Sequence, residues 1–95
     1  MKDGFCKRVE ISGIVQGVGF RWQTRQLAVR LGICGWIKNR PDGIVEAVFQ
    51  GTDVLVQGIL EWCANGPSGA TVTDLRLFEC VYDPDILDFV IISDR

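Results

Sequence analysis

The sequence predicts an α+β fold in which two helices cover one face of an antiparallel sheet. Apolar residues alternate with a period of two in some stretches and recur at helical spacing in others, in the order β-α-β-β-α-β. A Pro41-Asp42-Gly43 turn joins the second and third strands into a hairpin. The chain has 95 residues, enough for one domain and too few for two, so we expect a single domain over residues 1–95.

The first strand and the first helix follow from hydrophobic periodicity. Residues 7–14 alternate apolar and polar side chains and predict a strand. Residues 21–31 predict a helix, which Gly32 ends because glycine tolerates the left-handed conformation that closes many helices. The inner face of this helix is expected to carry five side chains at helical spacing: Phe20, Thr24, Leu27, Ala28 and Leu31.

The middle of the chain predicts the hairpin and a second helix. Residues 34–38 and 44–50 form the two strands of the hairpin. Thr52 or Asp53 is placed to cap a helix that runs to about Ala64. Its inner face is expected to carry five apolar side chains: Leu55, Val56, Ile59, Leu60 and Cys63.

The end of the chain completes a ferredoxin-like sandwich. Residues 72–82 predict a long strand, and residues 89–92 predict a short extra strand near the C-terminus. Two helices on one face of a βαββαβ sheet are the split βαβ arrangement. Right-handed crossovers place the first strand in the centre of the sheet, beside the third. The loop after the first strand then lies near the end of the second, so Arg21 and Asn39 can face a common pocket.

The turn between the first strand and the first helix is a candidate anion-binding site. It has the sequence Val15-Gln16-Gly17-Val18-Gly19-Phe20-Arg21. The first amides of a helix have no internal partner, and the helix dipole places partial positive charge there. Gly17 and Gly19 allow the backbone to form a concave nest of N–H groups. Arg21 adds a planar fork of donors that fits a phosphate.

Composition excludes several classes of protein. The net charge of −2 and the pI of about 4.9 argue against a general nucleic-acid-binding protein, whereas a small anion needs only the local charge of Arg21, Lys38 and Arg40. No apolar run approaches the ~20 residues that cross a membrane, so we expect no membrane association. Residues 1–4 lack the apolar stretch of a secretory signal, which makes the cytoplasm the expected location.

The cysteines do not suggest a metal or redox motif. Cys6, Cys34, Cys63 and Cys80 show no C-x-x-C spacing, and the chain has no histidine, so we expect no metal site. The favoured interpretation is four buried or half-buried thiols in a reducing compartment. A disulfide between Cys6 and Cys80 is a second possibility, because the first and fourth strands should pair antiparallel and place both side chains on the helix-free face.

Two separated motifs resemble the acylphosphatase family. The first is Ser12-Gly13-Ile14-Val15-Gln16-Gly17-Val18-Gly19-Phe20-Arg21; the second is Leu31-Gly32-Ile33-Cys34-Gly35-Trp36-Ile37-Lys38-Asn39, continued by Asp42-Gly43-Ile44-Val45-Glu46. The resemblance implies hydrolysis of small acyl phosphates to a carboxylate and inorganic phosphate, with no metal, no cofactor and no covalent intermediate. It implies that Arg21 binds the phosphoryl group and that Asn39 holds the attacking water. It also implies a phosphate-binding role for the backbone amides of the loop: Gln16, Gly17, Val18, Gly19 and Phe20.

The chemistry of an acyl phosphate agrees with this sequence. Its leaving group is a carboxylate, whose conjugate acid has a pKa of about 4, so it needs no proton at neutral pH. A chain without histidine therefore suits this substrate better than an alkyl phosphate ester. The competing hypothesis is a catalytically silent anion-binding or regulatory ferredoxin-like module, since the fold alone does not decide function. We expect no nucleic-acid partner, and nothing in the sequence requires more than a monomer.

Overall fold

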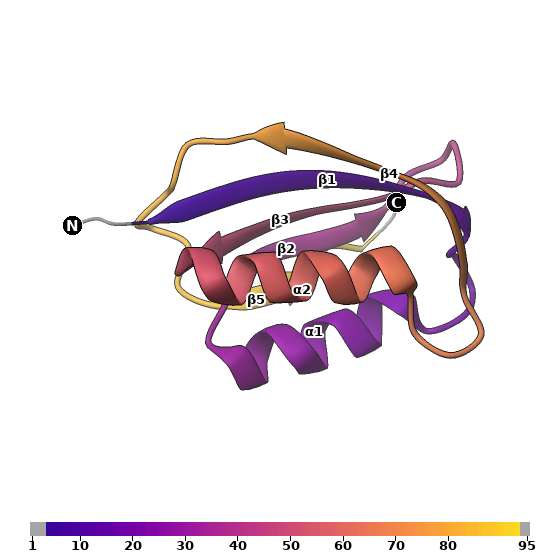
Figure 1. Cartoon of the computed structure of the whole chain (residues 1–95), viewed down its shortest axis with the longest axis horizontal. Helices are drawn as coiled ribbons and strands as arrows, with labels where there is room; N and C mark the ends of the chain where they lie inside the picture. The colour runs from indigo at the N-terminus through magenta and orange to yellow at the C-terminus, as the bar shows by residue number, and fades with distance from the viewer. Residues whose placement is uncertain (1–3, 94–95) are drawn as a thin grey trace.

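The computed structural model describes residues 4–93, and each predicted element is present with its ends shifted by up to three residues. The elements are β1 (Phe5–Ile14), α1 (Phe20–Leu31), β2 (Cys34–Asn39), β3 (Val45–Gly51), α2 (Asp53–Asn65), β4 (Thr71–Glu79) and β5 (Phe89–Ile91). Figure 1 shows both helices packed on the same face of the twisted sheet.

The strand order is β4-β1-β3-β2-β5, with β1 in the centre beside β3 as predicted. Pairs among the first four strands are antiparallel, but β5 pairs in parallel with β2. The predicted antiparallel sheet is therefore formed by β1 to β4, and the extra strand β5, whose direction was not predicted, makes the sheet mixed. The reason lies in the connection after β4, which crosses to the opposite edge of the sheet before the chain turns into β5 (Figure 1).

The predicted inner faces of the two helices form the core with the sheet. On α1, Phe20, Thr24 and Ala28 are buried, and the Thr24 hydroxyl donates a 2.7 Å hydrogen bond to the Phe20 carbonyl. On α2, the buried side chains are Val56, Ile59, Leu60 and Cys63. Thr52 occupies the N-cap position of α2, but its side chain makes no capping hydrogen bond. Within residues 4–93, neither helix is long and apolar enough to span a bilayer.

Cys6 and Cys80 form a disulfide, with their Cα atoms 5.4 Å apart. The expectation of four thiols is therefore wrong for this pair, and the cross-strand alternative is confirmed. β4 ends at Glu79, directly before Cys80, and not at residue 82 as predicted. Cys34 and Cys63 are free, and burial raises the pKa of the Cys63 thiol to about 12, which makes it unreactive.

The segment of residues 80–88, here called the crossing segment, is held by a second tie. The buried Gln50 side chain donates from Nε2 to the Asp83 carbonyl at 2.7 Å, and its Oε1 accepts from the Asp83 backbone N–H at 3.1 Å. The backbone N–H of Gly35 then donates to the Asp88 carbonyl at 2.9 Å. These bonds carry the chain onto the free edge of β2 and place β5 there.

Candidate active site

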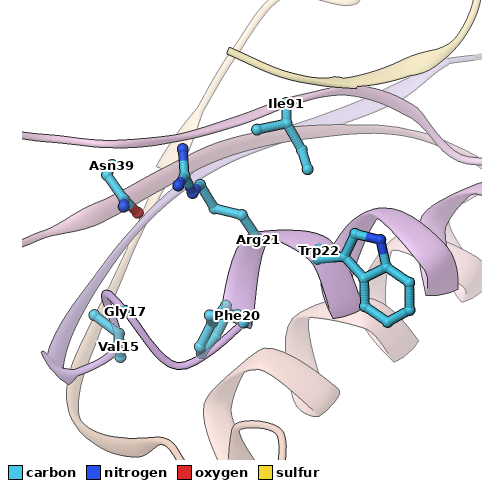
Figure 2. A pocket seen from close by; sticks show the side chains of 8 residues that line it. Val15, Gly17, Phe20, Arg21, Trp22, Asn39 and Ile91 are labelled. Carbon is cyan, nitrogen blue, oxygen red and sulfur yellow. The ribbon is translucent and has the colours of Figure 1, made fainter. Parts of the chain in front are cut away.

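The candidate site is a cavity of about 160 Å³ at the end of the sheet where β1 and β2 finish. This is several times the volume of about 30 Å³ that one water molecule occupies in the liquid. The glycine loop (residues 15–19) forms one side of the cavity, and the start of α1 and the ends of β2 and β5 form the others (Figure 2). The lining residues are Val15, Gly17, Gly19, Phe20, Arg21, Trp22, Asn39 and Ile91.

The start of α1 has the features of an anion site. Gly19 is the N-cap residue, with φ 79° and ψ 16°, and no side chain caps the helix. The first turn has no acidic residue and instead carries Arg21, which the helix dipole disfavours unless an anion is present. Gly17 also has a positive φ of 76°, a conformation that costs other residues roughly 1–2 kcal/mol. Such left-handed residues turn successive N–H groups toward one concave point.

Arg21 and Asn39 converge from different elements of the fold. Figure 2 shows the guanidinium of Arg21 extending from the first turn of α1 toward the Asn39 amide at the end of β2. Asn39 Oδ1 is buried and has no hydrogen-bond partner within residues 4–93. Leaving a buried acceptor unsatisfied costs about 1–3 kcal/mol, so this atom calls for a functional explanation.

Two other cations named from the sequence lie on the helix-free side of the site. Arg40 donates to Glu10 and to Asp42, each at 2.8 Å, and Lys38 Nζ lies 4.0 Å from a Glu46 carboxylate oxygen. The hydrogen bond to Asp42 is the largest cause that raises the pKa of Arg40, followed by the bond to Glu10. Both cations therefore lie beside carboxylates, and neither residue lines the cavity, whereas Arg21 does.

The structure brings together most, but not all, of the residues named from the sequence. Gly17, Gly19, Phe20, Arg21 and Asn39 line one cavity. The other two named residues, Gln16 and Val18, do not line this cavity. Gln16 lines a neighbouring hollow of about 450 Å³, and the Val18 side chain packs against the core. A role for the amides of these two residues stays a prediction.

Sequence reasoning missed two residues that line the cavity, Trp22 and Ile91, and gave no role to Val15, the first residue of the predicted anion-binding turn, which lines it too. Ile91 comes from β5, whose parallel pairing with β2 sets it opposite Ile37. The apolar run of residues 89–92 indicated a strand, but did not indicate which strand it would pair with. Trp22 directly follows Arg21, and its indole points away from the guanidinium in Figure 2.

A model of the acylphosphatase family matches residues 7–91. The chain belongs to the acylphosphatase family. An acylphosphatase from Gloeobacter violaceus is 51% identical over 69 residues, which cover 73% of this chain and 74% of that protein. One from Syntrophus aciditrophicus is 44% identical over 87 residues, covering 92% and 91%. The structure of an acylphosphatase from Coxiella burnetii superimposes with a TM-score of 0.88 at 37% identity, covering 95% of this chain and 94% of that one.

The acylphosphatase assignment confirms the predicted enzyme class, a hydrolase (acylphosphatase, EC 3.6.1.7), and does not favour a silent module. It also confirms the ferredoxin-like sandwich. Within residues 4–93, no group of three or more His, Cys, Asp or Glu side chains is arranged to hold a metal ion. The remaining question is what each residue of the cavity does.

Proposed function

We propose that this cavity is the active site of an enzyme that hydrolyses small acyl phosphates to a carboxylate and inorganic phosphate. Arg21 binds two phosphoryl oxygens with its guanidinium, and the backbone amides from Gln16 to Phe20 bind the others. Asn39 holds the attacking water. The observation that carries this proposal is the buried, unpartnered Oδ1 of Asn39, a residue that lines the same cavity as Arg21. A water that donates to this oxygen satisfies the acceptor and keeps a lone pair free for the phosphorus.

The reaction needs placement and charge neutralisation more than proton transfer. The water oxygen forms a bond to phosphorus as the bond from phosphorus to the carboxylate oxygen breaks. The electron pair of that bond leaves with the carboxylate, which needs no acid because its conjugate acid has a pKa of about 4. The proton of the water passes to a phosphoryl oxygen of the substrate. A pH–rate profile that requires an enzyme base would contradict this last step.

The decisive experiment compares turnover with binding. Purified protein should release phosphate from benzoyl or acetyl phosphate in the presence of a chelator. Asn39→Ala should lower kcat about 100- to 1,000-fold, because one preorganised polar group is lost, while the affinity for inorganic phosphate changes little. Wild-type protein without turnover would favour the silent module. Near-full activity in Asn39→Ala would remove the water-positioning role.

The proposal also covers the domain organisation, the oligomeric state and the cellular location of the enzyme. The length of the chain and the contiguous core within residues 4–93 support a single domain over residues 1–95, and we propose that this domain acts as a monomer. Light scattering at working concentration tests the monomer. We keep the cytoplasm as the proposed location, and the Cys6–Cys80 disulfide is the observation that opposes it, because disulfides are rare in reducing compartments. Blocking the free thiols in the cells that produce the protein, and then counting them, tests the location. Four free thiols would support the cytoplasm, whereas two would show that the disulfide is present in the cell.

A further inference from the structure

The Gln16 side chain joins two segments that are far apart in the sequence. Its Nε2 donates to the Arg40 carbonyl at 2.8 Å and to the Ile44 carbonyl at 3.1 Å. Gln16 belongs to the glycine loop, whereas residues 40–44 form the turn of the β2–β3 hairpin, here called the hairpin turn. Both protons of one amide group thus tie the proposed phosphate-binding loop to the hairpin.

The two carbonyls that Gln16 binds are the ones that close the hairpin turn. The Ile44 carbonyl accepts from the Arg40 N–H at 2.8 Å, and the Arg40 carbonyl accepts from the Gly43 N–H at 3.1 Å. Gln16 therefore uses the second lone pair of each oxygen, and both acceptors face it together only when the turn is closed.

The contact lies directly beside the proposed catalytic amide. Arg40 follows Asn39 in the chain, and Ile44 precedes Val45, which is the cross-strand partner of Asn39. One side chain thus holds the backbone next to Asn39 on one strand and next to its partner on the other. On the loop side, Gln16 precedes Gly17, whose positive φ helps to shape the concave backbone.

We propose that the Gln16 side chain is a positioning residue, which sets the distance and direction between the phosphoryl group held by the glycine loop and the water held by Asn39. This inference rests on the proposed function. Misplacement of a reacting group by about 1 Å can cost roughly 100-fold in rate. The side chain contributes to turnover through Asn39, and the phosphate-binding role of the Gln16 backbone amide is separate from it.

A second glutamine provides a matched control. Gln50 also makes two hydrogen bonds from its side-chain amide to distant backbone, at 2.7 Å and 3.1 Å to Asp83, and its side chain is 1% exposed. It lies at the opposite end of the sheet, beside Cys6, because Cys6 pairs with Gln50 in the register of β1 and β3. Each glutamine side chain ties together two segments that are distant in the sequence, but only Gln16 does so at the candidate site.

The experiment compares Gln16→Met, Gln50→Met and the wild type, because methionine keeps the length of the side chain and removes the amide. We measure kcat and KM for benzoyl phosphate, the Kd of inorganic phosphate by calorimetry, and the urea midpoint. We expect Gln16→Met to lower kcat about 10- to 100-fold while the Kd of phosphate stays within about threefold. Gln50→Met should lower the urea midpoint and leave kcat within about threefold of wild type.

Three outcomes overturn the inference. Gln16→Met could keep wild-type kcat, it could lose no more kcat than Gln50→Met, or its affinity for phosphate could fall in parallel with kcat. If Gln16→Met does not fold, Gln16→Asn carries the same expectation, because it keeps the amide but shortens its reach by one methylene. A wild-type enzyme without turnover refutes the proposed function itself, whereas wild-type turnover with an unchanged Gln16 variant refutes only the positioning role.

Discussion

At each end of the sheet, a glutamine side chain ties two distant segments together, but the two ends serve different purposes. At the end opposite the cavity, which we call the crossing end, Gln50 ties β3 to the crossing segment. At the site end, Gln16 ties the glycine loop to the hairpin turn. Each glutamine uses its side-chain amide to bind backbone groups more than 20 residues away, with sequence separations of 33 for Gln50 and of 24 and 28 for Gln16.

The two ends differ in whether their buried polar groups have hydrogen-bond partners. At the crossing end, Gln50 and Asp83 exchange both donor and acceptor, and the Cys6–Cys80 disulfide lies beside them. At the site end, Asn39 Oδ1 is buried without a partner within residues 4–93. A buried polar group with all its bonds made stabilises the fold, whereas one left open marks a place where a ligand completes the structure.

The largest expected effect comes from Arg21→Lys. Lysine keeps the positive charge but loses the fork of donors that matches two phosphoryl oxygens. We expect kcat/KM to fall about 1,000-fold and phosphate binding to weaken about 10- to 100-fold, as for the loss of a charge-assisted hydrogen bond. Steady-state kinetics and calorimetry measure the two effects.

Arg30→Lys is the control for Arg21→Lys. Arg30 lies in the last turn of the same helix, where a cation of either kind interacts favourably with the dipole. Its kcat/KM should stay within about twofold of wild type. Equal kinetics in the two variants would show that Arg21 does not bind the phosphoryl group.

The next effect should fall on stability at the crossing end. Cys6→Ala/Cys80→Ala removes a link between residues 74 positions apart and should lower the free energy of unfolding by about 2–4 kcal/mol. For a domain of this size, that is a drop in Tm of about 10 °C or more. Thermal unfolding with and without reductant measures it. Below the new Tm, kcat should stay within about threefold of wild type.

Cys34→Ala keeps the disulfide and serves as the control, so its Tm should still fall when reductant is added. A folded double variant with strongly reduced kcat would contradict the separation of the two ends. It would mean that the crossing segment fixes the site through β5 and Ile91, which lines the cavity.

Local rules were sufficient for most of the fold. The helical spacing of Phe20, Thr24 and Ala28 predicted a buried face, and these side chains are buried. The Pro41-Asp42-Gly43 sequence predicted the hairpin turn, because each residue suits a turn conformation. The central place of β1 followed from the handedness of crossovers alone.

The sequence did not indicate contacts that depend on where distant segments meet. The parallel pairing of β5, and with it the place of Ile91 in the cavity, depends on the path of the crossing segment. The side chain of Gln16 lies in a motif whose backbone was expected to bind phosphate, and nothing local showed that it binds the hairpin turn. The Cys6–Cys80 pair was possible in geometry, but the choice between thiol and disulfide was not fixed by spacing.

The smallest expected effect is a difference in acid sensitivity between the two ends. Glu10, on the helix-free face, accepts from Arg8 at 2.9 Å and from Arg40 at 2.8 Å. The Arg8 bond is the first cause that lowers the pKa of Glu10, and Arg40 adds to it. In the hairpin turn, the Ile44 N–H is the first cause that lowers the pKa of Asp42.

A carboxyl group whose pKa is lower in the folded state stabilises the fold above its unfolded pKa, which is about 4 for these residues. This stabilisation is lost as the pH falls through the folded pKa. Acid should therefore loosen the hairpin turn first, because the disulfide and the Gln50 amide at the crossing end do not titrate. The protection factors for backbone hydrogen exchange at residue 40 and residues 42–44, corrected for the intrinsic pH dependence of exchange, should fall from pH 5 downward before those of residues 48–50.

Glu10→Gln tests the cause of this acid sensitivity. The variant removes the titrating group, so its urea midpoint should change less between about pH 5 and pH 3 than that of the wild type. Glu79→Gln is the control, because it removes a carboxylate that is 86% exposed and whose ion pair with Lys7 lies at the crossing end, away from Glu10 and the hairpin turn. Its acid profile should follow the wild type. An unchanged profile in Glu10→Gln would mean that the acid response of the site end arises elsewhere, with Asp42 the next residue to replace.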